Sequence, residues 1–193
     1  MKKCLMEASM KIVQFMSKVD PQKCNGDKRC EKLCPSGAIK VVDKIAVVQQ
    51  DRCVACGKCS EVCREDAVEM VRRDQPHTIA FDMESVDPEK IQALCAQAGL
   101  LPDLPLCACT ATTVGEIAAS ILGGAKSPED VVVGTGAGSG CGIYCMAVIF
   151  KLFACAGVQI PKDPRWNNLP LTSHDVSEEI AKKYPEYHFD SLT

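Results

Sequence analysis

The stretch Cys53-Val-Ala-Cys56-Gly-Lys-Cys59-Ser-Glu-Val-Cys63 carries four cysteines at the spacing C-x2-C-x2-C-x3-C. Two-residue gaps let one tight loop aim three thiolates at a common centre, and thiolates are soft metal ligands. An earlier segment repeats this pattern, and the flanking sequence repeats with it, because Ala38-Ile39 corresponds to Ala67-Val68. The two segments together therefore form a duplicated unit, and Asp27 occupies the second-ligand position of the first copy. The four equivalent positions of that first copy hold Cys24, Asp27, Cys30 and Cys34.

The composition restricts how so many cysteines can be used. The chain has 193 residues, 14 of them cysteine, and a net charge of −3, which argues against a nucleic-acid-binding protein. Glu7 and Lys11 interrupt the apolar residues of the first segment, so we expect an amphipathic N-terminal helix over 1–19 and not an export signal. We therefore expect a cytoplasmic protein, in which clustered cysteines indicate metal ligation more than a disulfide framework.

One apolar segment, 143–160, is only just long enough to be considered as a membrane span. Lys151 lies within it, and a central lysine costs about 2.5–3.5 kcal/mol in a bilayer. The segment also begins inside a cysteine motif. We expect a buried helix, or one that faces a partner, and no membrane span.

The duplicated unit resembles the bacterial dicluster 2[4Fe–4S] ferredoxin family over about residues 20–72. In that family the fourth cysteine of each run serves the other cluster. The resemblance implies a site 1 and a site 2, each holding one [4Fe–4S] cluster, with Cys63 and Cys34 exchanged between the runs. The implied ligands are Cys24, Asp27, Cys30 and Cys63 at site 1, and Cys34, Cys53, Cys56 and Cys59 at site 2.

Two positions depart from the family pattern. Asp27 offers a harder oxygen donor, which can ligate iron weakly, leave an exchangeable corner, or leave a three-iron cluster. Arg64 replaces the usual proline after the fourth cysteine, which weakens the turn but keeps the ligand set. Zinc ribbons use two Cys-x2-Cys pairs that lie farther apart, so the compact run at 53–63 fits zinc poorly.

The pattern around the cysteines predicts local structure. Each half is expected to have a short helix after its third ligand position and a strand after its fourth. The segments Ile39–Val42 and Ile45–Val48, joined at Asp43-Lys44, predict a β-hairpin.

A second cysteine motif lies in the other half of the chain. It consists of the pair Cys107-Ala-Cys109 and, farther along, the pair in Cys141-Gly-Ile-Tyr-Cys145. A small-residue helix and a second helix, capped by Ser127, are expected between the pairs. The glycines of 134–142 do not fit the G-x-G-x-x-G fingerprint of nucleotide binding. We expect them instead to bring backbone N–H groups close to the sulfurs of a cluster.

This order of motifs, including Gly124-Ala125 and the loop 135–142, resembles the bacterioferritin-associated ferredoxin (BFD-like) family over about 105–155. The resemblance implies a small all-α, helix-turn-helix domain with one [2Fe–2S] cluster at a site 3. The last pair here is C-x3-C where the family has C-x2-C, so Cys95, in a helix expected at 88–99 after Asp87, is the alternative fourth ligand. The implied ligands of site 3 are Cys107, Cys109, Cys141 and Cys145.

The whole chain is thus predicted to be α+β, with a small ferredoxin-like dicluster domain before an all-α BFD-like domain. Cys4 and Cys155 are expected to pack in apolar helices, and Trp166 lies in a tail that forms either a docking surface or a strap over the chain's own core. The expected parts are an N-terminal helix (1–19), the dicluster domain (20–80), the BFD-like domain with its preceding helix (81–157) and the tail (158–193).

Three clusters without a nucleotide loop or a nucleophile constellation predict an electron-transfer subunit with no catalytic residues of its own. BFD-like domains also occur bound to flavoprotein dehydrogenases. The resemblance therefore implies a larger flavin- or metal-bearing partner subunit, with an external electron carrier as the other partner. The alternatives are a stand-alone reductant of a ferritin-type partner and a redox sensor built on Asp27.

Overall fold

The computed structural model describes residues 11–160 and 178–187. The chain divides into two compact units, Met1–Pro161 and Lys162–Thr193. In the second unit the described residues form α7 (Glu178–Lys183) and the 3-10 helix η3 (Pro185–Tyr187). Cys4 and Trp166 lie outside the described residues, so the expectations for them are not addressed.

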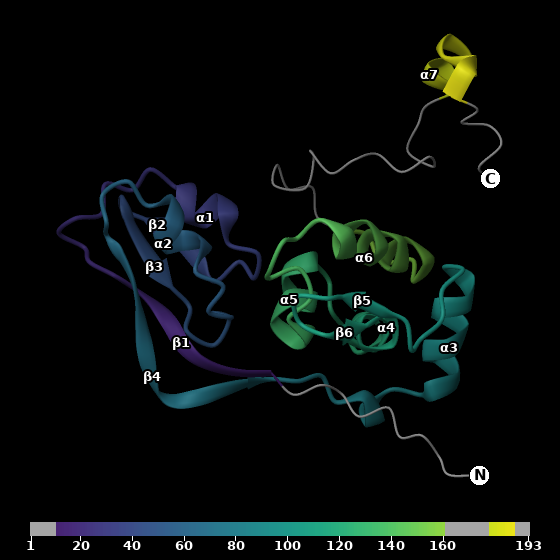
Figure 1. Cartoon of the computed structure of the whole chain (residues 1–193), viewed down its shortest axis with the longest axis horizontal. Coiled ribbons are helices and arrows are strands. Elements are labelled where there is room, and N and C mark those ends of the chain that lie inside the picture. The colour runs from purple at the N-terminus through teal and green to yellow at the C-terminus, as the bar shows by residue number, and fades with distance from the viewer. Residues whose placement is uncertain (1–10, 161–177, 188–193) are drawn as a thin grey trace. The chain divides into compact units, whose positions relative to one another are not determined.

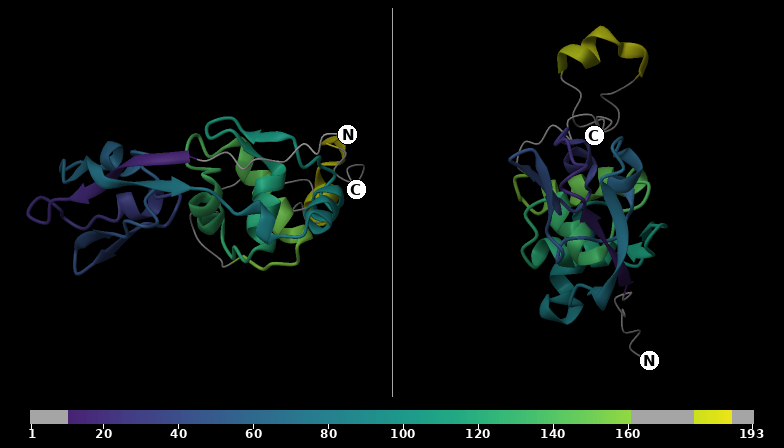
Figure 2. Two further views of the ribbon diagram at one scale, coloured as in Figure 1. Left: turned by 90° about the horizontal axis from the view of Figure 1, so that it is seen from below. Right: turned by 90° about the vertical axis from the view of Figure 1, so that its left-hand side faces the viewer.

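A long antiparallel strand pair belongs to the first unit: β1 (Lys11–Val19) lies along β4 (Val68–Ile79) (Figures 1 and 2). The helix predicted for the N-terminal segment is therefore wrong over residues 11–19. Val13 and Ser17 are the buried residues of β1, and the pairing register shifts between Val13 and Phe15. Phe15, which lies between Val13 and Ser17, is exposed, so the two buried residues are four positions apart, a spacing that a helix also shows.

The predicted hairpin is confirmed as β2 (Ile39–Val42) and β3 (Ile45–Val48), paired from Ile39 with Val48 to Val42 with Ile45. Asp43 and Lys44 have φ angles of 48° and 64°. Positive φ at both central residues is the geometry of a type I′ turn, whose twist matches that of the strands.

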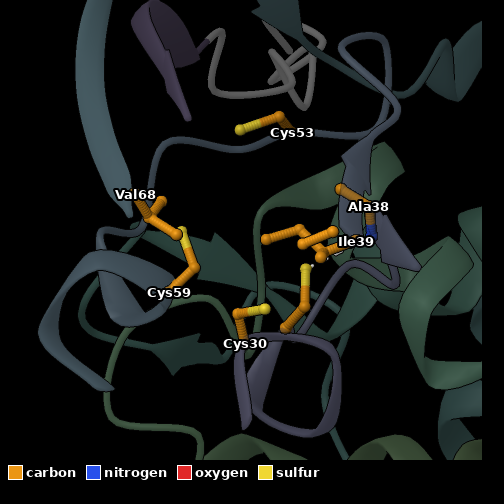
Figure 3. Packing of buried hydrophobic residues seen from close by; sticks show 8 residues of the cluster. Cys30, Ala38, Ile39, Cys53, Cys59 and Val68 are labelled. Carbon is orange, nitrogen blue, oxygen red and sulfur yellow. Dashed lines mark hydrogen bonds between the residues drawn. The ribbon is translucent and has the colours of Figure 1, made fainter. Parts of the chain in front are cut away.

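Two short helices show that the sequence repeat is also a structural repeat. α1 (Arg29–Leu33) carries Cys30, and α2 (Lys58–Val62) carries Cys59. Each helix follows a residue in the left-handed conformation and ends at a cysteine with extended backbone. The side chains of Cys30, Cys53 and Cys59 share a buried interior with apolar residues that include Ile39 and Val68 (Figure 3).

Helices dominate the second half of the first unit, in the order α3 (Pro88–Gln97), α4 (Val114–Leu122), α5 (Pro128–Thr135) and α6 (Tyr144–Cys155), preceded by η1 (Met83–Ser85). The predicted caps are confirmed: Asp87 accepts the N–H of Glu89, and Ser127 accepts the N–H of Asp130. Thr113 and Glu116 form a reciprocal capping box at the start of α4.

The expectation of an all-α domain is not confirmed, because β5 (Pro105–Cys107) pairs with β6 (Thr112–Thr113). The chain must reverse between Cys107 and the start of α4, and Ala111 has a φ of 49° in this reversal. The short ladder satisfies backbone groups on both sides of the turn. The site is therefore held by backbone pairing as well as by helices.

The apolar segment 143–160 contains α6, which packs as a core helix, as predicted. Ile149, Leu152 and Phe153 are fully buried, as are Val114 and Ile117 of α4. In residues 11–160 and 178–187, no helix has both the length and the apolar character needed to span a membrane.

Candidate metal centres

The four residues predicted for site 2 line one hollow. Three of them come from the loop and helix at Cys53, Cys56 and Cys59, and Cys34 comes from the first copy of the repeat. Cys34 accepts a hydrogen bond from the N–H of Ala38 at 3.2 Å. The structure thus places Cys34 where the exchange between the two halves requires it.

The four residues predicted for site 1 line a second hollow, together with Glu65. Cys63 accepts the N–H of Ala67 at 3.3 Å, which is the contact that Ala38 makes to Cys34 in the first copy of the repeat. The two hollows are thus built by equivalent contacts. The four predicted residues that line the hollow of site 1 are Cys24, Asp27, Cys30 and Cys63.

Asp27 is the structural counterpart of Cys56. The Asp27 carboxylate accepts the N–H of Arg29 at 3.0 Å, and the Cys56 sulfur accepts the N–H of Lys58, the equivalent residue of the second copy. The second carboxylate oxygen lies 3.3 Å from Nε of Arg29, and the Asp27 side chain is 37% exposed. Asp27 therefore stands at the ligand position, in a corner open to solvent and shared with a cation.

Burial opposes the charged form of one thiol at site 1 and of two thiols at site 2. It raises the pKa of Cys30 to about 11, with a smaller opposing effect of the Glu31 N–H. It also raises the pKa of Cys56 and of Cys59, although hydrogen bonds from Lys58 and Ser17 work against it. Thiolates therefore need a compensating positive charge here, which a metal centre supplies when it displaces the protons.

The donor set fits iron–sulfur clusters better than single zinc ions. Thiols predominate among the four predicted donors of each hollow, and backbone N–H groups point at the sulfurs of Cys34 and Cys63, as they do around iron–sulfur clusters. Within the described ranges, no three His, Cys, Asp or Glu side chains converge closely enough to hold one metal ion.

Site 3 joins the two cysteine pairs of the second half. Cys107 and Cys145 are buried, and the Cys145 thiol donates a hydrogen bond to Cys107. Cys109 and Cys141 are exposed and are also hydrogen-bonded to each other. The longer spacing to Cys145 therefore does not prevent its approach, because α6 turns it toward Cys107.

Glycine backbone reaches the sulfur of Cys107, as the sequence predicted. Burial alone raises the pKa of Cys107, but the Thr110 hydroxyl and the N–H groups of Gly138 and Thr110 outweigh it, and the pKa is lowered. Gly138 has a φ of 90°, which glycine adopts without strain. The pKa of Cys145 is raised to about 12 by burial and by the negative charge of Cys107. The pair thus holds one thiolate readily and a second only with compensation.

Other cysteines lie in the helices. Cys95 is fully buried in α3, and its pKa is raised by burial alone. Cys155 is half-buried at the end of α6. The four cysteines that contact one another at site 3 are those predicted first, and Cys95 is not among them.

Sequence reasoning missed three residues near the sites. Ser17 lies 3.6 Å from the Cys53 sulfur, because β1 is a strand and not the predicted helix. Arg29 and Lys58 hold the second-ligand positions through their N–H groups. The repeat carries a signal for the last two, since both are basic and occupy equivalent positions in its two copies, whereas no local pattern indicates Ser17.

We predict that Gly140→Ala disrupts site 3. An added Cβ would lie 2.5 Å from Cβ and 2.7 Å from Sγ of Cys109. Cys109 must then move away from Cys141, and iron bound at site 3 should fall to less than about half of the wild-type amount. The control is Gly157→Ala, which strains the backbone at a φ of 68° but adds no contact, since the added Cβ meets open space. Iron analysis and the visible spectrum check this, and full loading of Gly140→Ala would contradict it.

Comparisons with known proteins agree with this geometry. Residues 16–64 match the model of a 4Fe-4S dicluster domain, and residues 105–154 match that of a BFD-like [2Fe-2S] binding domain. No curated protein and no solved structure matches the chain significantly. A dicluster domain binds two [4Fe–4S] clusters, and a BFD-like domain binds one [2Fe–2S] cluster. The chain therefore contains a 4Fe-4S dicluster domain followed by a BFD-like [2Fe-2S] binding domain.

Proposed function

We propose that this chain is the electron-transfer subunit of a larger oxidoreductase and relays single electrons through three iron–sulfur clusters. Iron–sulfur domains of these two kinds imply electron transfer. The observation that carries the proposal is the pair of hollows, each lined by cysteines of both halves, beside a third cysteine site in the same unit. The proposed ligands are the residues named above for sites 1, 2 and 3.

The exposed edge of site 3 supports a docking role. Cys109 and Cys141 are exposed. Ile143 and Tyr144, which follow Gly142, are 69% and 81% exposed. Exposed apolar side chains beside a redox site suit a partner surface, because they are covered only when the partner binds. We propose that a flavin- or metal-bearing subunit docks here.

A reducing compartment agrees with the state of the thiols. Each described cysteine is a free thiol, including the exposed pair Cys109 and Cys141. Disulfides are rare where the cell keeps thiols reduced. We propose a cytoplasmic location, in which an external electron carrier exchanges electrons with the complex.

We predict that the tagged full-length chain retains a larger redox subunit from an anaerobic native extract. Ile143→Asp should weaken this retention by about tenfold or more, because it places a charge in the centre of the proposed contact. Leu101→Asp is the control, since Leu101 is 74% exposed in the loop before β5. A monomer that oxidises a substrate by itself would contradict the subunit proposal.

We predict that site 1 is isolated in part as a three-iron cluster after exposure to air, because Asp27 is a weaker ligand than a thiolate and also pairs with Arg29. Asp27→Cys should remove the three-iron EPR signal and give about ten iron atoms per chain, four at each [4Fe–4S] site and two at site 3.

The matched control is Cys56→Asp, the equivalent change in the second copy, which should create a three-iron signal at site 2. The idea of an exchangeable corner is wrong if the oxidised wild-type protein shows no three-iron signal and added thiols never reach site 1.

A further inference from the structure

The two iron–sulfur domains contact each other through residues that flank the ligands of site 2. Arg52 directly precedes Cys53. Its Nε donates to the carbonyl oxygen of Ser36 at 3.0 Å, and its Nη2 donates to Oδ1 of Asp130 at 3.1 Å. Ser36 stands two residues after Cys34. One guanidinium therefore joins both chain segments of site 2 to the first turn of α5.

Neighbouring backbone and side-chain groups orient the Asp130 carboxylate for its contact with Arg52. Its other oxygen accepts the N–H of Lys126 at 3.1 Å, and a negative charge is favourable in the first turn of a helix. Burial alone raises the pKa of Asp130, but hydrogen bonds from Lys126, Ser127 and Arg52 outweigh it, and the pKa is lowered. The carboxylate is thus ionised at neutral pH and fixed in direction.

Close packing accompanies this ion pair. A Cβ added to Gly37, in the turn after Cys34, would lie 3.3 Å from Cγ of Glu129 on α5. A Cβ added to Gly142, next to Cys141, would lie 3.9 Å from Nζ of Lys58, which stands between Cys56 and Cys59. The loops of site 2 therefore lie next to the loop that carries Cys141.

α5 connects the ion pair to site 3. The helix begins beside Arg52, ends at Thr135, and continues into the loop that contains Gly138 and Cys141. Lys11 of β1 donates to the carbonyl oxygen of Thr135 at 2.6 Å and pairs with Glu116 of α4 at 3.6 Å. Arg52 thus holds the N-terminal end of α5, and Lys11 of β1 holds its C-terminal end.

We propose that site 2, and not site 1, exchanges electrons directly with site 3, and that Arg52 and Asp130 are the positioning residues of this step. The proposal rests on the proposed electron-transfer function. One electron leaves the donor site and is gained by the acceptor site, so no bond changes and no further reactant is required. Site 1 follows site 2 in the relay, since Cys30 and Cys59 share one buried interior and the charge of Cys59 acts on Cys30 (Figure 3).

Tunnelling rates fall steeply with distance, so loosening this interface should affect electron transfer before it affects loading. The test uses the full-length, cluster-loaded chain with Asp130→Asn, which removes the charge, and Asp130→Lys, which faces Arg52 with a second cation. The control is Lys40→Gln, which breaks the surface pair of Lys40 with Glu31 at 3.7 Å within the dicluster half.

EPR of the reduced protein measures the magnetic interaction between site 3 and each [4Fe–4S] site, and rapid-freeze kinetics measures the internal transfer. We expect an interaction of site 3 with site 2 that Asp130→Lys weakens, with internal transfer slowed about tenfold, Asp130→Asn intermediate and Lys40→Gln unchanged. Iron content and the melting temperature establish that the variants fold and load.

An interaction of site 3 with site 1 alone would overturn the proposed order while leaving the electron-transfer function intact. Unchanged coupling and rate in a folded Asp130→Lys variant would overturn the role of the ion pair. Absence of internal transfer in every form, including wild type, would instead overturn the proposed function itself.

Discussion

The buried thiolate is the constraint on which this structure depends. Cys34 and Cys63 are each the last cysteine of one run, and each lines the hollow that is formed mainly by the other run. Burial disfavours the ionised form of the neighbouring thiol of Cys30. The negative charge of thiolates in these hollows must therefore be compensated by metal and by N–H donors such as those of Ala38 and Ala67. With the ligands that we propose, cluster binding would therefore also join the two halves. A domain as small as the dicluster half, whose apolar core is limited, gains from such a staple.

Much of the dicluster half follows from the sequence, because its signals are local. The spacing of the cysteines, the duplication of the motif and the Asp43-Lys44 turn predict the hollows and the hairpin that the structure contains. The strand β1 is different, because its partner β4 lies far along the chain and its two buried residues, Val13 and Ser17, are four positions apart. Long-range pairing outweighed a helical pattern there. Because the strand was not predicted, the contact of Ser17 with Cys53 was not predicted either.

In the BFD-like half, the caps and the role of glycine followed from residue chemistry, and the β5–β6 ladder did not, since β6 spans only Thr112–Thr113. The interface with the dicluster half was beyond prediction for a physical reason. Arg52 and Asp130 are ordinary charged residues in sequence, and only the fold brings them within 3.1 Å. Sequence thus predicts the candidate ligands of the clusters, whereas the order that we propose for the sites in the relay rests on tertiary contacts.

The exchange of Cys34 and Cys63 is the central claim, and anaerobic EPR of Cys63→Ala with iron and sulfide analysis tests it most directly. Because Cys63 lines site 1 with Cys24, Asp27 and Cys30, the variant should lose the site 1 signal and keep the [4Fe–4S] signal of site 2. Loss of the site 2 signal with site 1 intact would show that each run holds its own cluster, and would contradict this account.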